Sequence, residues 1–180
     1  MRSLDWHDKL ENPGPGILRR RPDDTQERTG ARKEQAEFEF AVVRLLNELR
    51  TPTIWYGDRQ YQDRPDLAAC IELKNEWIVL LGECTVQKPS VKFTPLLTRK
   101  RELEKLLQGD VRVLAAVFTS STLSSADKEQ ARQDGIALVG AEELAALLQG
   151  VVQEWGPDEV IAYLNGLLTE PLEFPIRWQS

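Results

Sequence analysis

Apolar residues recur along this chain in two patterns, one typical of helices and one typical of buried strands. In residues 31–49 they return every three or four positions, which predicts an amphipathic helix that packs against a sheet. Short apolar runs predict strands in residues 53–56, 67–73, 77–84, 111–118 and 135–139. Further helical patterns follow in residues 93–108, 124–133, 141–148 and 157–168.

The order of these elements predicts the fold class and the organisation of the chain. One helix, three strands and then alternating helices and strands indicate an α/β fold with a mixed central sheet flanked by helices. Residues 1–30 are rich in Pro, Gly, Arg and Asp, so we expect an extended arm there. We expect the core in residues 31–150 and a C-terminal helix and tail in residues 151–180.

The second and third predicted strands are close enough in sequence to form a hairpin. A turn centred at 75–76 pairs Asp66 with Thr85, whereas a turn centred at 74–75 pairs Asp66 with Glu83. Both registers bring the carboxylates of Asp66 and Glu83 close together where apolar strands end.

Two carboxylates at the edge of a buried sheet repel each other and lose hydration, which raises their pKa unless a cation lies between them. A divalent cation would balance this charge. Hard oxygen ligands without clustered Cys or His residues favour Mg²⁺ or Mn²⁺ over Zn²⁺. We therefore expect a metal site at Asp66 and Glu83.

The residues around these two acids resemble a nuclease signature. Pro65-Asp66, an apolar strand, a turn and a second strand with Gly82-Glu83-Cys84-Thr85 look like the PD-(D/E)XK motif of restriction-endonuclease-like nucleases. The order of elements from residue 31 to residue 148 is similar to the core of that superfamily. The resemblance implies a restriction-endonuclease-like fold and a Mg²⁺- or Mn²⁺-dependent endonuclease that hydrolyses phosphodiester bonds, with DNA as the expected partner.

This chain departs from the motif at Thr85, which stands where the family usually has lysine and cannot supply its positive charge. Some members of the superfamily recruit that lysine from the following element. Lys92 is therefore our first candidate and Lys88 our second. Arg99 lies on the same stripe of the predicted helix as Lys92, which makes it a candidate for contact with a substrate phosphate, and Gln87 is another.

Nucleases of this type also resemble one another in carrying a Glu on the first helix, directed at the same metal. Glu34, Glu37 and Glu39 compete for this role. Glu39 shares its helical face with Val42 and Leu46, so we expect it to point toward the sheet. Burial of a carboxylate there costs free energy unless the carboxylate has a partner, which favours a functional role. We prefer Glu39 and place Glu37 second.

Thr85 also leaves a second function open, a catalytically inactive nuclease-like domain that binds nucleic acid or a protein partner. The charge pattern favours a nucleic-acid partner in either case. The formal net charge is −6, yet residues 86–112 contain seven Lys and Arg residues against three Asp and Glu residues. Such a local basic excess beside an acidic pair is typical of a phosphate-binding face.

Location and assembly can be predicted from the remaining apolar residues. No apolar run is long enough to cross a bilayer, so we expect no membrane partner. Cys70 and Cys84 lie inside apolar runs and should be reduced core residues, which predicts a cytoplasmic protein. A last apolar stripe follows an apparently complete core and predicts a homodimer, or else cover by the N-terminal arm. That stripe consists of Val160, Ile161, Leu164, Leu167 and Leu168.

Overall fold

The computed structural model describes residues 30–56, 64–74, 76–107 and 111–169. The predicted arm, apart from Gly30, and the end of the predicted tail lie outside the described residues. The expected α/β architecture with a mixed sheet is confirmed.

The sheet has five strands in the order β1-β2-β3-β4-β5. The β1–β2 and β2–β3 pairs are antiparallel, and the β3–β4 and β4–β5 pairs are parallel. The bounds are Thr53–Trp55 for β1, Leu67–Glu72 for β2, Trp77–Thr85 for β3, Val111–Thr119 for β4 and Ile136–Val139 for β5. Strands β3 and β4 are buried almost throughout, because helices cover both faces of the sheet, which explains their continuous apolar sequences.

The helices lie where helical periodicity predicts them. Their bounds are Gly30–Glu48 for α2, Phe93–Leu106 for α3, Ser125–Gln133 for α4, Ala141–Val152 for α5 and Pro157–Gly166 for α6. A 3₁₀ turn, η3, which we did not predict, spans Pro89–Lys92 and leads into α3. Proline is favoured at the start of such a turn, because the first N–H group of a helix has no acceptor within the helix and its absence costs nothing. None of the described helices is long and apolar enough to cross a bilayer.

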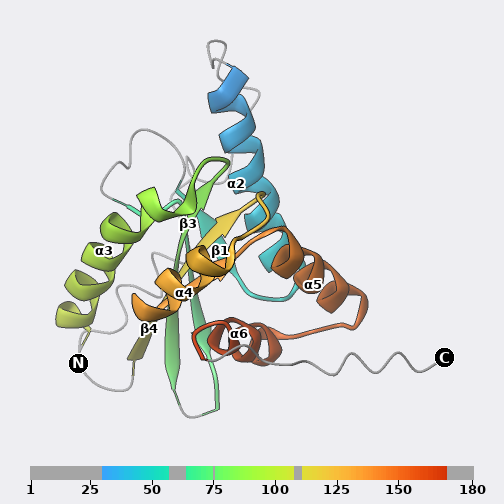
Figure 1. Ribbon diagram of the computed structural model, residues 1–180. Helices are drawn as coiled ribbons and strands as arrows, with labels where there is room; N and C mark the ends of the chain where they lie inside the picture. The colour runs from blue at the N-terminus through green and yellow to red at the C-terminus, as the bar shows by residue number, and fades with distance from the viewer. Residues whose placement is uncertain (1–29, 57–63, 75, 108–110, 170–180) are drawn as a thin grey trace.

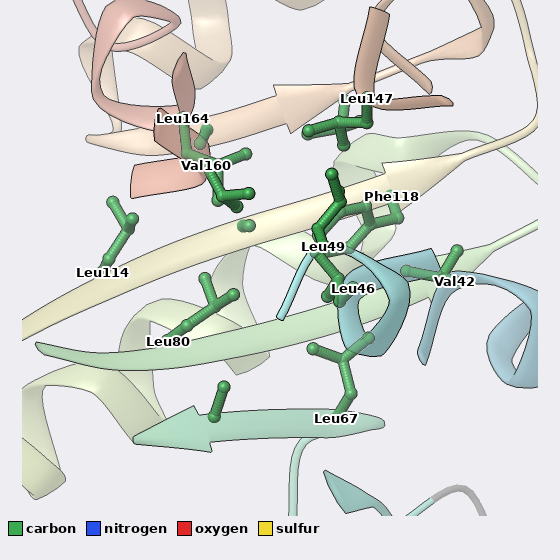
Figure 2. Packing of buried hydrophobic residues seen from close by; sticks show 14 of the residues in the cluster. Val42, Leu46, Leu49, Leu67, Leu80, Leu114, Phe118, Leu147, Val160 and Leu164 are labelled. Atoms are coloured by element: carbon green, nitrogen blue, oxygen red, sulfur yellow. The ribbon is translucent and has the colours of Figure 1, made fainter. Parts of the chain in front are cut away.

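Two hydrophobic clusters form the core, one on each face of the sheet. Helices α2, α5 and α6 pack on one face, and α3 and α4 pack on the other. In Figure 1, α3 lies on the opposite side of the sheet from α5 and α6. Figure 2 shows the first cluster, in which Leu46 of α2, Leu147 of α5 and Leu164 of α6 approach Leu80 and Phe118 of the sheet.

Helix α6 corrects one expectation. Its apolar stripe does not follow a completed core, because Val160, Ile161 and Leu164 are at most 2% exposed and belong to the same cluster as α2 and α5. The sheet of the chain itself covers this face (Figure 2). The argument for a homodimer from an uncovered C-terminal stripe is therefore wrong.

The β2–β3 hairpin adopts the second of the two registers considered above. Leu67 pairs with Gly82, and this pairing continues in steps to Glu72 and Trp77. Extending it by one residue places Asp66 opposite Glu83. This register centres the hairpin between positions 74 and 75, and Asn75 itself lies outside the described residues.

Candidate active site

The candidate site lies at the edge of the sheet where β2 begins and β3 ends. Asp66 immediately precedes β2, and its Oδ2 accepts the backbone N–H of Cys84 at 2.8 Å. Its backbone carbonyl accepts the N–H of Tyr56 at 2.8 Å, which ties the same residue to the end of β1. The Asp66 carboxylate thus takes the place of a backbone acceptor in the ladder, and its position is fixed by both neighbouring strands.

Glu83 lies near the end of β3 on the face that helix α3 covers. Alternate residues of a strand share a face, and Val79 and Leu81 belong to the cluster under α3. The Glu83 side chain is only 3% exposed. The preceding residue, Gly82, has no room for a side chain, because a Cβ there would collide with Leu67 of β2. This close approach explains the glycine in the Gly82-Glu83 pair.

Lys92 joins the two carboxylates. Its Nζ donates to Glu83 Oε2 at 2.7 Å and to Asp66 Oδ2 at 3.2 Å. The lysine ends the 3₁₀ turn η3, so it enters the site from the element that follows β3. Arg99, two helical turns further along, makes an ion pair with Oε1, the other carboxylate oxygen of Glu83.

The burial of these charges changes their protonation. Burial, and next the neighbouring Asp66, raise the pKa of Glu83 to about 7, and the cations Lys92 and Arg99 offset part of this effect. Burial acts to lower the pKa of Lys92, but Asp66 and Glu83 outweigh it and raise that pKa above its ordinary value. Lys92 is therefore a permanently charged amine between two acids.

Glu39 approaches the same edge from helix α2. It is 5% exposed, and its Oε1 and Oε2 accept hydrogen bonds from Gln35 Nε2 at 2.8 Å and Trp55 Nε1 at 3.0 Å. Burial, and next Asp66, raise its pKa to about 7. Its rivals Glu34 and Glu37 are exposed, and Glu37 forms a surface ion pair. Glu39 is thus the helix carboxylate that interacts electrostatically with Asp66.

The structure does not bring Lys88 and Gln87 into this cluster. Both side chains are exposed, and neither makes a hydrogen bond or ion pair with the described part of the chain. Thr85 is 3% exposed, and its Oγ1 accepts the backbone N–H of Gln87 at 3.0 Å. Thr85 therefore shapes the end of β3.

Sequence reasoning missed the role of Gln35. Its Nε2 donates to the carbonyl oxygen of Cys84 at 2.8 Å, and its Oε1 accepts the N–H of Val86 at 3.1 Å. The available signal was its position four residues before Glu39, which places both residues on one helix face. Trp55 packs against the core, and its bond to Glu39 was not predicted from the sequence.

The site supplies two of the carboxylate ligands that a hard divalent cation would need. Among the described residues, no group of three or more His, Cys, Asp or Glu side chains is gathered closely enough to bind an ion. Asp66 and Glu83 nevertheless converge on one cation, the Lys92 amine, and carboxylate oxygens are the ligands that Mg²⁺ and Mn²⁺ prefer. Both oxygens of Glu39 already accept hydrogen bonds, from Gln35 and Trp55, and no bond between Glu39 and Lys92 is seen among the described residues.

Comparison with known proteins supports the fold. No protein-family model and no curated protein matches the sequence. The small subunit of the heterodimeric restriction endonuclease R.BspD6I matches with a TM-score of 0.52 at 14% identity, covering 92% of this chain and 88% of the subunit. The restriction endonuclease MspJI, solved with a 27-mer oligonucleotide, matches 84% of this chain and 38% of its own at 15% identity, with a TM-score of 0.40. The fold is restriction-endonuclease-like.

Proposed function

We propose that this protein is a metal-dependent nuclease that hydrolyses phosphodiester bonds in DNA. The observation that carries the proposal is the convergence of Asp66 and Glu83 on the Lys92 amine at one edge of a restriction-endonuclease-like sheet. Two carboxylates and a lysine are the groups that the PD-(D/E)XK resemblance implies. Here the lysine comes from a later position.

Asp66 and Glu83 would hold Mg²⁺ or Mn²⁺, with Glu39 beside them as a further acidic group. Such an ion polarises a bound phosphate and lowers the pKa of a bound water. The protein supplies a buried Glu83 and a partly buried Asp66 for this purpose, and backbone bonds from two strands orient Asp66. The raised pKa of Glu83 means that cation binding would also drive proton release from the site.

Lys92 supplies the positive charge that Thr85 lacks. Its raised pKa keeps it protonated, so it acts as an electrostatic group toward the phosphate or the attacking water. Arg99 is the second cation, and its guanidinium carries five N–H donors. Such a planar fork of donors matches the oxygens of a phosphate, which makes Arg99 our candidate for a phosphate contact beside Glu83.

The surface next to the site offers further phosphate contacts. Lys88, Arg101 and Lys105 are exposed just before η3 and on α3, in the same basic segment of the chain as Lys92 and Arg99. A polyanion that reaches the carboxylates would gain charge neutralisation from these residues. DNA is proposed as the polymer because of the family resemblance and because the neighbour R.BspD6I is itself a restriction endonuclease.

Incubation of the purified protein with Mn²⁺ and supercoiled, linear and single-stranded DNA tests the proposal. We expect cleavage that EDTA abolishes and that the Asp66→Asn variant lacks. Glu72→Gln, an exposed carboxylate at the other end of β2, is the matched control and should cleave normally. DNA binding without cleavage would instead support the catalytically inactive domain that the threonine at position 85 favours.

We also propose that the protein works in the cytoplasm. Both of its cysteines, Cys70 and Cys84, are free thiols in the described chain. Of these, Cys84 is buried and Cys70 partly buried, and unpaired thiols are typical of reducing compartments. Fractionation of the native host cell would test this part.

A further inference from the structure

Gln35 on helix α2 is bound to three groups at the site. Its Nε2 donates to the Cys84 carbonyl oxygen and to Glu39 Oε1, each at 2.8 Å, and its Oε1 accepts the Val86 N–H at 3.1 Å. Its amide thus bonds the backbone on either side of Thr85. A residue in a parallel strand opposite Thr85 would make the same two backbone bonds.

This pairing occurs where β3 extends beyond its neighbour. Strand β2 begins at Leu67, which pairs with Gly82, so the later residues of β3 have no β2 backbone opposite them. The Cys84 N–H is bonded by the Asp66 carboxylate, and the next two groups on that side are bonded by Gln35. Unpaired backbone groups at a partly buried edge are costly, so these side chains complete the ladder.

We infer that Gln35 is a positioning residue of the proposed active site. One of its amide hydrogens fixes the end of β3, which carries Glu83, and the other fixes the Glu39 carboxylate. Loss of this amide frees the strand end and one carboxylate at the same time. The inference rests on the proposed nuclease function insofar as it assigns this geometry to metal binding and cleavage.

Helix α2 offers a matched control in Asn47. Its Nδ2 donates to the Thr53 carbonyl oxygen at 3.1 Å, and its Oδ1 accepts the Thr53 N–H at 3.1 Å. Asn47 therefore fastens the same helix to β1 with the same kind of amide. The two residues are twelve positions apart, or about 18 Å along a helix, so Asn47 is remote from the carboxylates.

The experiment compares Gln35→Met with Asn47→Leu, which both keep side-chain size and remove the amide. Both variants should lower the melting temperature by a similar amount. Only Gln35→Met should weaken Mn²⁺ binding in calorimetry, by about tenfold, and lower kcat for DNA by at least about tenfold with KM unchanged, since Gln35 contacts ligands and not substrate. Equal Mn²⁺ affinity and kcat in the two variants would overturn the inference.

A second measurement separates this inference from the proposed function. Amide hydrogen exchange at Val86 should become at least about tenfold faster in Gln35→Met and stay unchanged in Asn47→Leu, whether or not the protein cleaves DNA. If the parent neither binds Mn²⁺ nor cleaves, the nuclease proposal fails, while faster exchange still supports the positioning role. Unchanged protection of Val86 overturns that role in every case. Gln35→Asn, one methylene shorter, serves the same tests if the methionine variant does not fold.

Discussion

The Nζ atom of Lys92 lies 2.7 Å from Oε2 of Glu83, on the face of β3 that helix α3 covers. The amine comes from the turn after the strand and not from position 85 on the strand itself. It also reaches the partly buried Asp66 at 3.2 Å, so one amine bridges two acids. This geometry leads to the first prediction.

Lys92→Met should lower DNA cleavage by at least about 100-fold, because a neutral side chain cannot stabilise charge at the phosphate. The metal-free protein should also lose about 2 kcal/mol of stability, since two acids lose their shared cation; a fully buried pair would lose more. Added Mn²⁺ should restore more stability to this variant than to the parent in thermal unfolding.

Lys88→Met and Thr85→Val are the controls for Lys92. Lys88 is exposed, and the Thr85 hydroxyl accepts only a local backbone bond among the described residues, so both variants should keep most of the activity. Full activity in Lys92→Met together with inactivity in Lys88→Met would transfer the role to Lys88.

The carboxylates should be needed for metal binding but not for folding. Asp66→Asn and Glu83→Gln preserve shape, and each should weaken Mn²⁺ binding in calorimetry by at least about tenfold because a charged oxygen ligand is lost. The metal-free Asp66→Asn protein should be as stable as the parent or more so, because repulsion toward Glu39 and Glu83 disappears. Normal Mn²⁺ affinity in both variants would mean that the metal lies elsewhere.

The stability of the metal-free protein should fall as pH rises. The pKa of Glu39 is raised from 4.5 to about 7, so between these values the folded protein binds a proton that the unfolded chain has released. This contribution is complete below about pH 4.5 and is lost as pH rises through about 7. A shift of this size corresponds to about 3 kcal/mol at most.

Denaturant unfolding in EDTA at about pH 5.5 and about pH 8 measures this dependence. Glu39→Gln should reduce the slope and leave the part that comes from Glu83, whose pKa is also raised to about 7, whereas Glu37→Gln, an exposed neighbour on the same helix, should leave the slope unchanged. An identical slope in the Glu39 variant would show that another group is responsible.

Leu164→Ala should destabilise the protein by about 2–5 kcal/mol without changing its mass in solution. Leu164 is completely buried in the core of its own chain, so the substitution creates a cavity. Leu148→Ala, at a position 58% exposed on α5, should change stability by less than about 0.5 kcal/mol. A drop from dimeric to monomeric mass in light scattering of the Leu164 variant would instead make α6 part of an interface.

The sequence by itself determined the elements of this fold and the meeting of Asp66 with Glu83. Helical and strand periods are local properties, and they were sufficient to predict every described helix and strand, apart from η3 and a few terminal residues. The two carboxylates were expected to meet because both registers of a short hairpin bring them together. That conclusion needed no knowledge of the turn that the chain adopts.

Tertiary structure decided among the remaining candidates for the site and added Gln35 to them. Lys92 lies nine positions after Glu83, at the end of a 3₁₀ turn, so the direction of the lysine depends on how α3 packs on the sheet. Gln35 lies 49 residues from Cys84, and spacing within a helix cannot show which strand end it will bond. Likewise, the apolar stripe of α6 looks the same in sequence whether its own sheet or a second chain covers it. Packing across the sheet decides such long-range pairings, because it selects one face of each helix and one end of each strand.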